Sequence, residues 1–259
     1  LLGVRDIRFV RRDSLDALTA AQDVPVGFQL GTTLGRSLRV LGSREDDLFV
    51  SGELYAGHVN EFGVLRLQLR GEARQAIGSS AWDGVVTSGR ASQSVRLGPR
   101  HVQLTSLEWS GAFNARTPYQ LLMGVPEGGV RGFQRSTLAG GERLVGRLEE
   151  RWALGRLSTF GDVGAALFTD VGRQWAGSVP FGQTSGVKGS LGVSVLAAVP
   201  MRSSRVWRAD LAIPLGGGAN ARWQIGFTNS DRTQFIYREP RDIAEAREPT
   251  APASLFSWP

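Results

Sequence analysis

Apolar and polar side chains alternate at every second position over long stretches of this chain. Between residues 142 and 154, one set of alternate positions is mostly charged and the other is mostly apolar. The first set is Arg143, Val145, Arg147, Glu149 and Arg151, and the second is Leu144, Gly146, Leu148, Glu150 and Trp152. Because successive side chains of a β-strand point to opposite faces, this period of two predicts a strand with one charged face.

The same pattern recurs in several other segments, among them residues 65–74, 191–199, 207–215 and 223–228. These segments run for about ten to fifteen residues, whereas strands of soluble proteins average roughly five or six. A strand crosses a tilted path through a bilayer in about nine to eleven residues. The pattern therefore predicts an all-β protein, a transmembrane antiparallel β-barrel whose apolar face meets lipid. The structural alternative is a water-soluble sandwich, which would need a second layer over its apolar rows.

Eleven strands are predicted along the chain. They cover residues 4–12, 26–40, 46–58, 62–75, 83–97, 100–114, 142–155, 159–175, 187–200, 204–216 and 220–230. Short turns are expected at Gly98–Pro99, at Leu154-Gly155-Arg156, at 201–204 and at 216–218. They alternate with longer connections, notably 115–141 and 176–186.

Two expectations follow from this layout. Bacterial barrels have short periplasmic turns and long external loops, so the 115–141 loop is expected on the outer side. An even strand number is usual, and the chain starts at Leu1 with neither an initiator methionine nor a signal peptide. We therefore expect further sequence before Leu1, and eleven or twelve visible strands as part of a larger barrel.

Composition narrows the class of protein. No apolar run approaches the roughly twenty residues of a membrane helix, which excludes a helical membrane protein. The net charge of +6 raises the question of nucleic acid. However, the arginines are spread along strands and do not cluster with stacking aromatics, so no nucleic-acid partner is expected. With no cysteine, two histidines and no catalytic triad, phosphate loop or glycosidase pair, we expect no metal, no cofactor and no enzymatic activity.

Two short motifs carry the most information. Val130-Arg131-Gly132-Phe133 ends a Gly-rich loop, and Phe168-Thr169-Asp170-Val171-Gly172 lies on an alternating strand within forty residues of it. An arginine in a long loop and an aspartate on a strand are natural partners, because a guanidinium offers a rigid fork of donors to a carboxylate.

These motifs, together with Gly140-Gly141-Glu142-Arg143, Leu148-Glu149 and the segment 208–215, resemble the bacterial surface-antigen family. This is the superfamily of the BamA and TamA outer-membrane assembly proteins and of the two-partner-secretion transporters. The resemblance is clearest over residues 115–230. It implies a barrel of about sixteen strands, of which this chain is the C-terminal part. In the family the VRGF loop precedes the fifth strand from the end, and five strands are predicted after it here.

The resemblance also implies roles for individual residues. The family's long loop folds back into the lumen, where acidic side chains of the inner wall hold its arginine. Arg131 takes that role here, with Asp170 as its expected partner and Glu149 and Asp210 as second candidates. Strand parity agrees, because Asp170 shares a face with Phe168 and Gly172, opposite the apolar positions 167 and 171. The alternative is that Arg131 lies in a solvated external loop.

Two further roles are expected in the same loop. Gly132 allows a tight turn or a positive φ angle. Phe133 is expected to pack against the inner wall.

The chain departs from the family pattern at its C-terminal end. Family barrels finish on an aromatic residue that closes the last strand, whereas residues 236–259 form a tail rich in Pro, Ala and Glu. We expect this tail to be irregular and to follow a barrel domain that spans residues 1–235. No periplasmic POTRA-type domain is visible in the sequence.

The protein is expected to be located in the bacterial outer membrane and to function there. The leading hypothesis is a barrel that acts in insertion or translocation of proteins, by pairing a client strand at a weak seam. The alternatives are an accessory barrel subunit of a larger complex, a passive pore, and the membrane anchor of a fused patatin-like enzyme. The expected partners are outer-membrane lipid, including lipopolysaccharide, and client proteins or complex subunits.

Overall fold

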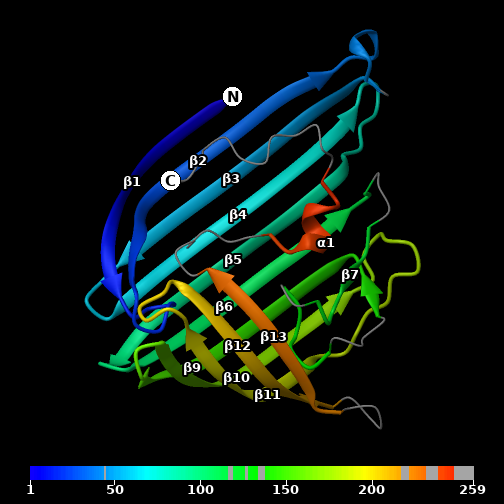
Figure 1. Cartoon of the computed structure of the whole chain (residues 1–259). Helices are drawn as coiled ribbons and strands as arrows, with labels where there is room; N and C mark the ends of the chain where they lie inside the picture. Colours follow the sequence, from blue (N-terminus) through cyan, green and yellow to red (C-terminus); the bar gives the residue numbers. More distant parts are fainter. Residues whose placement is uncertain are drawn as a thin grey trace.

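One antiparallel sheet dominates the structure, a computed structural model that describes residues 1–43, 45–115, 119–125, 128–133, 138–216, 222–231 and 239–247. Its eleven strands pair in chain order (Figure 1). They are β1 (Leu2–Asp13), β2 (Ala21–Ser37), β3 (Asp47–Val59), β4 (Gly63–Ala76), β5 (Asp83–Gly98), β6 (His101–Phe113), β9 (Glu142–Leu157), β10 (Gly161–Trp175), β11 (Lys188–Ala198), β12 (Arg205–Leu215) and β13 (Gln224–Asp231).

Small elements lie in the connections and near the C-terminal end. β7 (Leu121–Leu122) and β8 (Ala139–Gly140) pair as a short hairpin inside the connection between β6 and β9. A 3-10 turn, η1 (Arg39–Leu41), follows β2, and a four-residue helix, α1 (Arg241–Ala244), follows β13. Within the described ranges, no helix has the length and apolar character needed to span a bilayer.

The prediction of an all-β antiparallel protein is confirmed, but the described strands are not closed into a barrel. In the described residues β1 pairs only with β2, and β13 pairs only with β12. Because the eleven described strands pair antiparallel in chain order, β1 and β13 run in the same direction, so these two edges are not suited to antiparallel pairing with each other.

The strand boundaries agree with the predicted segments to within a few residues, except at one turn. The turn expected at Leu154-Gly155-Arg156 lies inside β9, where the pairing with β10 shifts register and Gly155 takes a φ of +143°. An extra residue in one strand of a pair makes a bulge, for which glycine is suited. The chain reverses a few residues later, at 158–160. The turn expected at 216–218 falls mostly outside the described residues.

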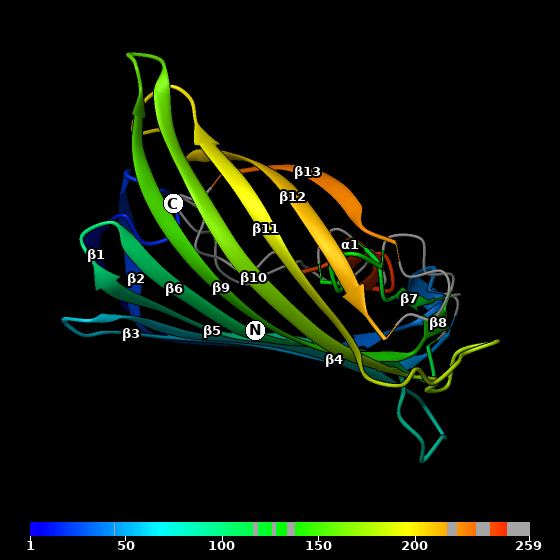
Figure 2. The ribbon, with the colours of Figure 1, turned by 90° about the horizontal axis from the view of Figure 1, so that it is seen from below.

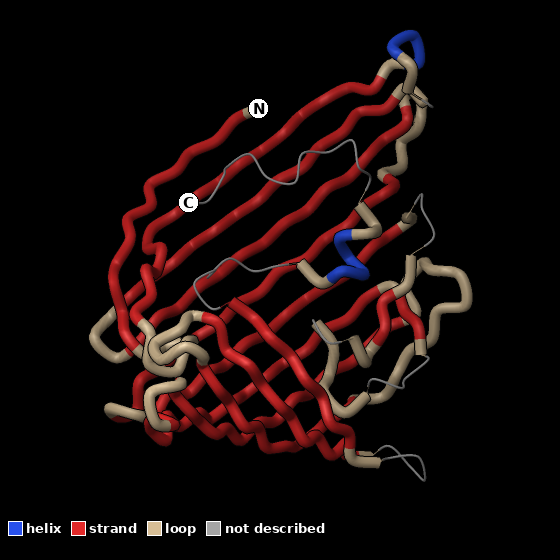
Figure 3. The backbone as a smooth tube through the Cα atoms, viewed as in Figure 1, coloured by secondary structure: helices blue, strands red, loops and turns tan. Residues whose placement is uncertain are grey.

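The sheet is strongly curled, and its connections gather at its two ends (Figures 2 and 3). In Figure 2, β9 to β13 rise over the flatter part formed by β3 to β6, and α1 lies inside the curve. The connections at one end are mostly short, and those at the other, including 114–141 and 176–187, are mostly longer. The alternation of short and long connections is therefore as predicted.

Polarity across the sheet is the reverse of that in a water-soluble protein. Charged side chains are buried on the concave side, and they include Arg66, Glu72, Arg74, Glu108, Arg143, Glu149, Arg151, Asp170, Arg208 and Asp210. Large apolar side chains are exposed at the alternate positions, and they include Leu65, Leu69, Leu107, Leu148, Leu167, Val171, Leu191, Val193, Val195, Leu211, Ile213 and Ile225. Contiguous exposed apolar surface of this kind is uncommon on monomeric soluble proteins.

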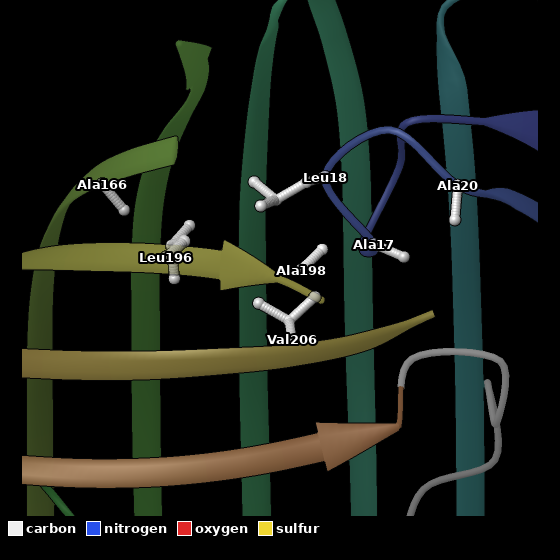
Figure 4. Packing of buried hydrophobic residues seen from close by; sticks show 7 residues of the cluster. All are labelled: Ala17, Leu18, Ala20, Ala166, Leu196, Ala198 and Val206. Atoms are coloured by element: carbon white, nitrogen blue, oxygen red, sulfur yellow. The ribbon is translucent and has the colours of Figure 1, made fainter. Parts of the chain in front are cut away.

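The connection between β1 and β2 folds into the curve and forms an apolar cluster with distant strands. Ala17, Leu18 and Ala20 pack with Ala166 of β10 and with residues of β11 and β12 (Figure 4). A Cβ at Gly164 would lie 2.6 Å from the Leu18 side chain, so the glycine leaves the space that Leu18 occupies. The first and last parts of the sheet are thus joined across the concave side without strand pairing.

Candidate functional site: the Arg131 clamp

The connection between β6 and β9, which we call the inner loop, lies against the inward face of β10. Asp170 is fully buried and Phe168 nearly so, whereas Leu167 and Val171 are about half exposed. Because side chains alternate across a strand, the parity of Asp170 places its carboxylate on the concave side. The orientation agrees with the parity argument from the sequence.

Arg131 donates three hydrogen bonds to the carboxylate of Asp170. Its Nε donates to Oδ2 of Asp170 at 2.7 Å, and its Nη2 donates to Oδ1 at 2.7 Å. The backbone N–H of Arg131 also donates to Oδ2, at 3.1 Å. Two parallel bonds from a planar guanidinium to one carboxylate fix both orientation and distance. The solvated-loop alternative for Arg131 therefore does not describe the structure.

Glu149 of β9 is the second acceptor for Arg131 and is shared among three arginines. Nη1 of Arg131 donates to Oε2 of Glu149 at 3.2 Å. Arg208 of β12 donates to both carboxylate oxygens, at 2.9 and 2.7 Å, and Arg151 donates to Oε1 at 2.7 Å. A single carboxylate thus connects the loop to β9 and β12, and no one of these contacts is independent of the others.

Asp210, the third candidate partner, is linked to Arg131 only through Arg208 and Glu149 in the contacts described. Its carboxylate accepts from Nε of Arg208, and it also accepts from the Ser194 hydroxyl at 2.5 Å. Nη2 of Arg208 in turn donates to the same hydroxyl at 2.6 Å. Asp210 therefore orients Arg208, which binds Glu149, rather than holding the loop arginine itself.

The Phe168 ring completes the setting of Arg131. The Cζ atom of Arg131 lies 3.5 Å from the ring centroid of Phe168, and that of Arg208 lies 5.6 Å from it. A guanidinium over an aromatic face is attracted by the quadrupole of the ring, and the attraction grows when water is excluded. We call Arg131, Asp170, Glu149 and Phe168 the Arg131 clamp.

The charge state of Arg131 is secure. Burial acts to lower the pKa of the Arg131 guanidinium, but the hydrogen bonds and charge of Asp170 and the charge of Glu149 outweigh it, so the pKa is raised.

The remaining motif residues shape the loop around the clamp. Gly132 has a φ of +85°, a conformation that favours glycine. A Cβ at Gly172 would lie 2.6 Å from Cγ2 of Val130, so that glycine admits the loop valine against β10. Phe133 packs on an apolar cluster that contains Val130 and two other buried residues, Met123 and Val145.

Other wall residues hold the loop but were not singled out in the sequence. Arg147 donates to the carbonyl of Gly129 at 2.7 Å and to Oε2 of Glu108 at 3.0 Å. Gln174 donates to the carbonyls of Leu121 and Leu138, at 3.1 and 3.2 Å. Strand parity already placed Arg147 on the charged face, but nothing in the sequence indicated that its acceptor would be a backbone carbonyl of the loop.

The clamp is suited to holding the inner loop in place, because every charged group in it is paired with a neighbour of opposite charge. The chain matches no protein-family model, no curated protein and no solved structure. The geometry of the clamp and the reversed polarity of the sheet are therefore the features of this chain that bear on its function.

Proposed function

We propose that the eleven strands belong to an outer-membrane β-barrel of the BamA and TamA type, which acts in the insertion or translocation of proteins. The observation that carries the proposal is the Arg131 clamp. The VRGF loop lies on the concave face, and its arginine is held by the aspartate and phenylalanine of the FxDxG strand. Two motifs that define the resemblance are thus joined as the resemblance implies.

The polarity of the sheet supports a membrane setting. Its exposed face carries rows of leucine, valine and isoleucine, and its concave face carries buried arginines and carboxylates. In a transmembrane barrel the outer side chains contact lipid and the inner ones line a polar lumen. Lipid of the outer membrane, lipopolysaccharide included, is the proposed partner of the apolar rows.

The proposed activity would take place at a strand edge of the full barrel. Among the described strands, β1 and β13 each have one side without a strand partner. An exposed edge offers backbone donors and acceptors to an incoming strand, which is the basis of β-augmentation. A client strand that pairs at such an edge can enter the membrane while its own hairpins form.

The membrane setting is tested by charge placed on the exposed face. Leu167→Arg puts a guanidinium on the outward face in the middle of β10, and Leu157→Arg puts one at the end of β9. At the bilayer midplane such a charge costs about 2–4 kcal/mol, and near the interface about 0–1 kcal/mol. We expect lipid vesicles to take up the first variant poorly and the second normally. Equal uptake of both would contradict a lipid-facing position for Leu167.

The activity is tested by reconstitution. The full chain in vesicles of outer-membrane lipid is given an unfolded client barrel, and the folded fraction is followed over time by its resistance to protease. The proposal expects faster client folding than in empty vesicles. A rate equal to that in empty vesicles or in vesicles holding a passive barrel would reject an assembly role.

An accessory barrel subunit is the second candidate, and the filling of the concave side favours it. The β1–β2 connection packs into one end of the curve, and residues 239–247 pack elsewhere on the same face. A filled interior suits a structural subunit that conducts nothing. In this case the chain would co-purify with envelope partners and would leave client folding unchanged.

A further inference from the structure

The segment after β13 folds back onto the concave face of the sheet. Residues 239–247 include α1, which lies over β5 and β6 in Figure 1. Ile243 is fully buried in a cluster with Val86 and Ala112 of the sheet, Tyr119 and Leu121 of the inner loop, and Val179 of the β10–β11 connection. The irregular tail expected from residue 236 therefore contains an ordered segment, which we call the C-terminal segment.

Charged side chains fix both ends of this segment. Arg247 pairs with Glu72 of β4 at 2.9 Å, and its Nε donates to Glu239 at 2.8 Å. Glu239 also accepts from the Ser88 hydroxyl of β5. Nη1 of Arg247 thus faces a wall carboxylate while the rest of the guanidinium joins the two ends of the segment to each other.

The middle of the segment contacts the inner loop as well as the wall. Arg143 of β9 donates to Asp242 at 2.8 Å and to the carbonyl of Leu122 at 2.5 Å. A Cβ at Gly128 would lie 2.5 Å from the Pro240 ring, so this loop glycine makes room for the proline. Arg143 is therefore shared between the loop and the segment.

The concave face of the sheet is complementary in charge to this segment. Arg143 and Glu72 are both buried, and the oppositely charged partners described for them, Asp242 and Arg247, come from the segment. A buried charge is costly when its partner is removed. Arg143, Glu72 and the apolar cluster around Ile243 therefore form a surface that is complementary to the C-terminal segment.

The segment itself is weakly held. α1 has four residues, far fewer than an isolated helix needs in water. Ile243 is its one large buried aliphatic side chain in the described residues, Pro240 and Ala246 add smaller apolar contacts, and the other anchors are polar. Segments with few buried apolar contacts open locally at low free energy.

We propose that the surface formed by Glu72, Ser88, Arg143 and the Ile243 cluster is a peptide-binding site, and that residues 239–247 are its reversible ligand, bound in cis, which locks the inner loop. The groups of the ligand that the site recognises are, in chain order, those of Glu239, Pro240, Asp242, Ile243 and Arg247. This inference does not depend on the assembly role proposed above.

The test uses the absence of cysteine from the chain. A single cysteine replaces buried Ala246, and its labelling by a maleimide is timed in the full chain in detergent. Arg247→Glu sets a third carboxylate against Glu72 and Glu239 and releases the segment. We expect labelling to accelerate by at least about tenfold, which corresponds to about 1.4 kcal/mol.

The matched control is Arg241→Glu, the same substitution on the same segment. Arg241 is exposed and pairs only locally with Glu245 in the contacts described, so labelling should be unchanged. A cysteine at exposed Leu157 gives the unprotected rate. If Ala246→Cys labels at that rate in the otherwise unchanged chain, or if both glutamate variants behave alike, the proposal is overturned.

The lock on the loop has its own reporter. Met123→Cys lies in the buried loop cluster, and its labelling should also accelerate in the Arg247→Glu background. An unchanged Met123→Cys rate beside a faster Ala246→Cys rate would overturn the lock. Circular dichroism checks that the sheet is intact in each variant.

A competition experiment covers the case in which Arg247→Glu does not fold. A synthetic peptide with the sequence of residues 239–247 is added to the Ala246→Cys chain. We expect it to raise the labelling rate with saturation, and a peptide with Ile243→Ser and Asp242→Asn to have no such effect. Equal effects of the two peptides would count against a specific site. The readout is thiol labelling alone, so a failure of client folding leaves this result standing.

Discussion

Two groups of buried arginines hold segments of the chain against the same concave face, and they differ in how they use carboxylates. In the Arg131 clamp, Glu149 accepts from three arginines and Asp170 accepts three bonds from one. In the C-terminal segment, Arg143 and Arg247 each have their own acidic partners, at separate places. The clamp is one connected network, whereas the segment is held by two groups of contacts that share no residue, Arg143 with Asp242 and Arg247 with Glu72 and Glu239.

This difference predicts different responses to mutation. In a connected network the loss of one member leaves several buried charges without full compensation, so the effects of mutations do not add. Separate contacts fail one at a time and nearly additively. The clamp is thus suited to permanent fixation of the inner loop, and the segment is suited to release.

The largest effect is expected from Asp170→Ala. It removes the carboxylate that accepts three bonds from Arg131, and breaking a buried pair costs about 3–5 kcal/mol. The free energy of unfolding is measured with denaturant in detergent, by tryptophan fluorescence. The double variant Arg131→Ala/Asp170→Ala should cost less than the sum of the two single variants. Additive costs would remove the basis for treating the clamp as a network.

A smaller effect is expected from Gly172→Ala. The new Cβ would lie 2.6 Å from Cγ2 of Val130, and such overpacking costs about 1–3 kcal/mol. Val130→Ala should restore part of the stability, because it removes the atom in conflict. If Val130→Ala worsens the loss, the loop valine does not contact Gly172 as described. The same unfolding measurement applies.

A still smaller effect on overall stability is expected from Asp242→Asn. Arg143 keeps its bond to the carbonyl of Leu122, so we expect a cost of roughly 1–2 kcal/mol. Combined with Arg247→Gln, the costs should add. A coupling between these two positions as strong as that in the clamp would erase the distinction between the two regions.

The mildest test uses pH. Burial acts to raise the pKa of Glu239, but the hydrogen bonds and charge of Arg247, the Ser88 hydroxyl and the charge of Arg70 outweigh it, and the pKa is lowered. A lowered folded-state pKa stabilises docking above the ordinary glutamate pKa of about 4.3, and this contribution is lost as pH falls through the lowered value.

Hydrogen exchange of residues 239–247 measures this loss. After correction for intrinsic rates, we expect protection to be constant at neutral pH and to fall progressively below about pH 4.3. The buried carboxylate of Glu72 also faces Arg247, so Glu239→Gln serves as the control and should reduce the pH dependence. Equal pH dependence in Glu239→Gln would assign it to another group.

β10 illustrates how far the sequence alone could lead. Its period of two predicted the inward positions, and each of them contacts an inward segment. Asp162 accepts from the hydroxyl of Thr19 in the β1–β2 connection, Gly164 admits Leu18, Asp170 binds Arg131 and Gly172 admits Val130. Parity is a local property of the backbone, so the strand ranges and the inward face could be predicted from the residues. The Arg131–Asp170 pair was expected from the family resemblance, and parity only agreed with it.

Contacts between segments distant in the chain were decided only by the tertiary structure. Neither the burial of Leu18 between β10 and β11 nor the docking of Ile243 has a periodic signal, because short apolar segments in loops are compatible with many surfaces. The role of Asp210 also changed, since Arg208 lies between it and the loop.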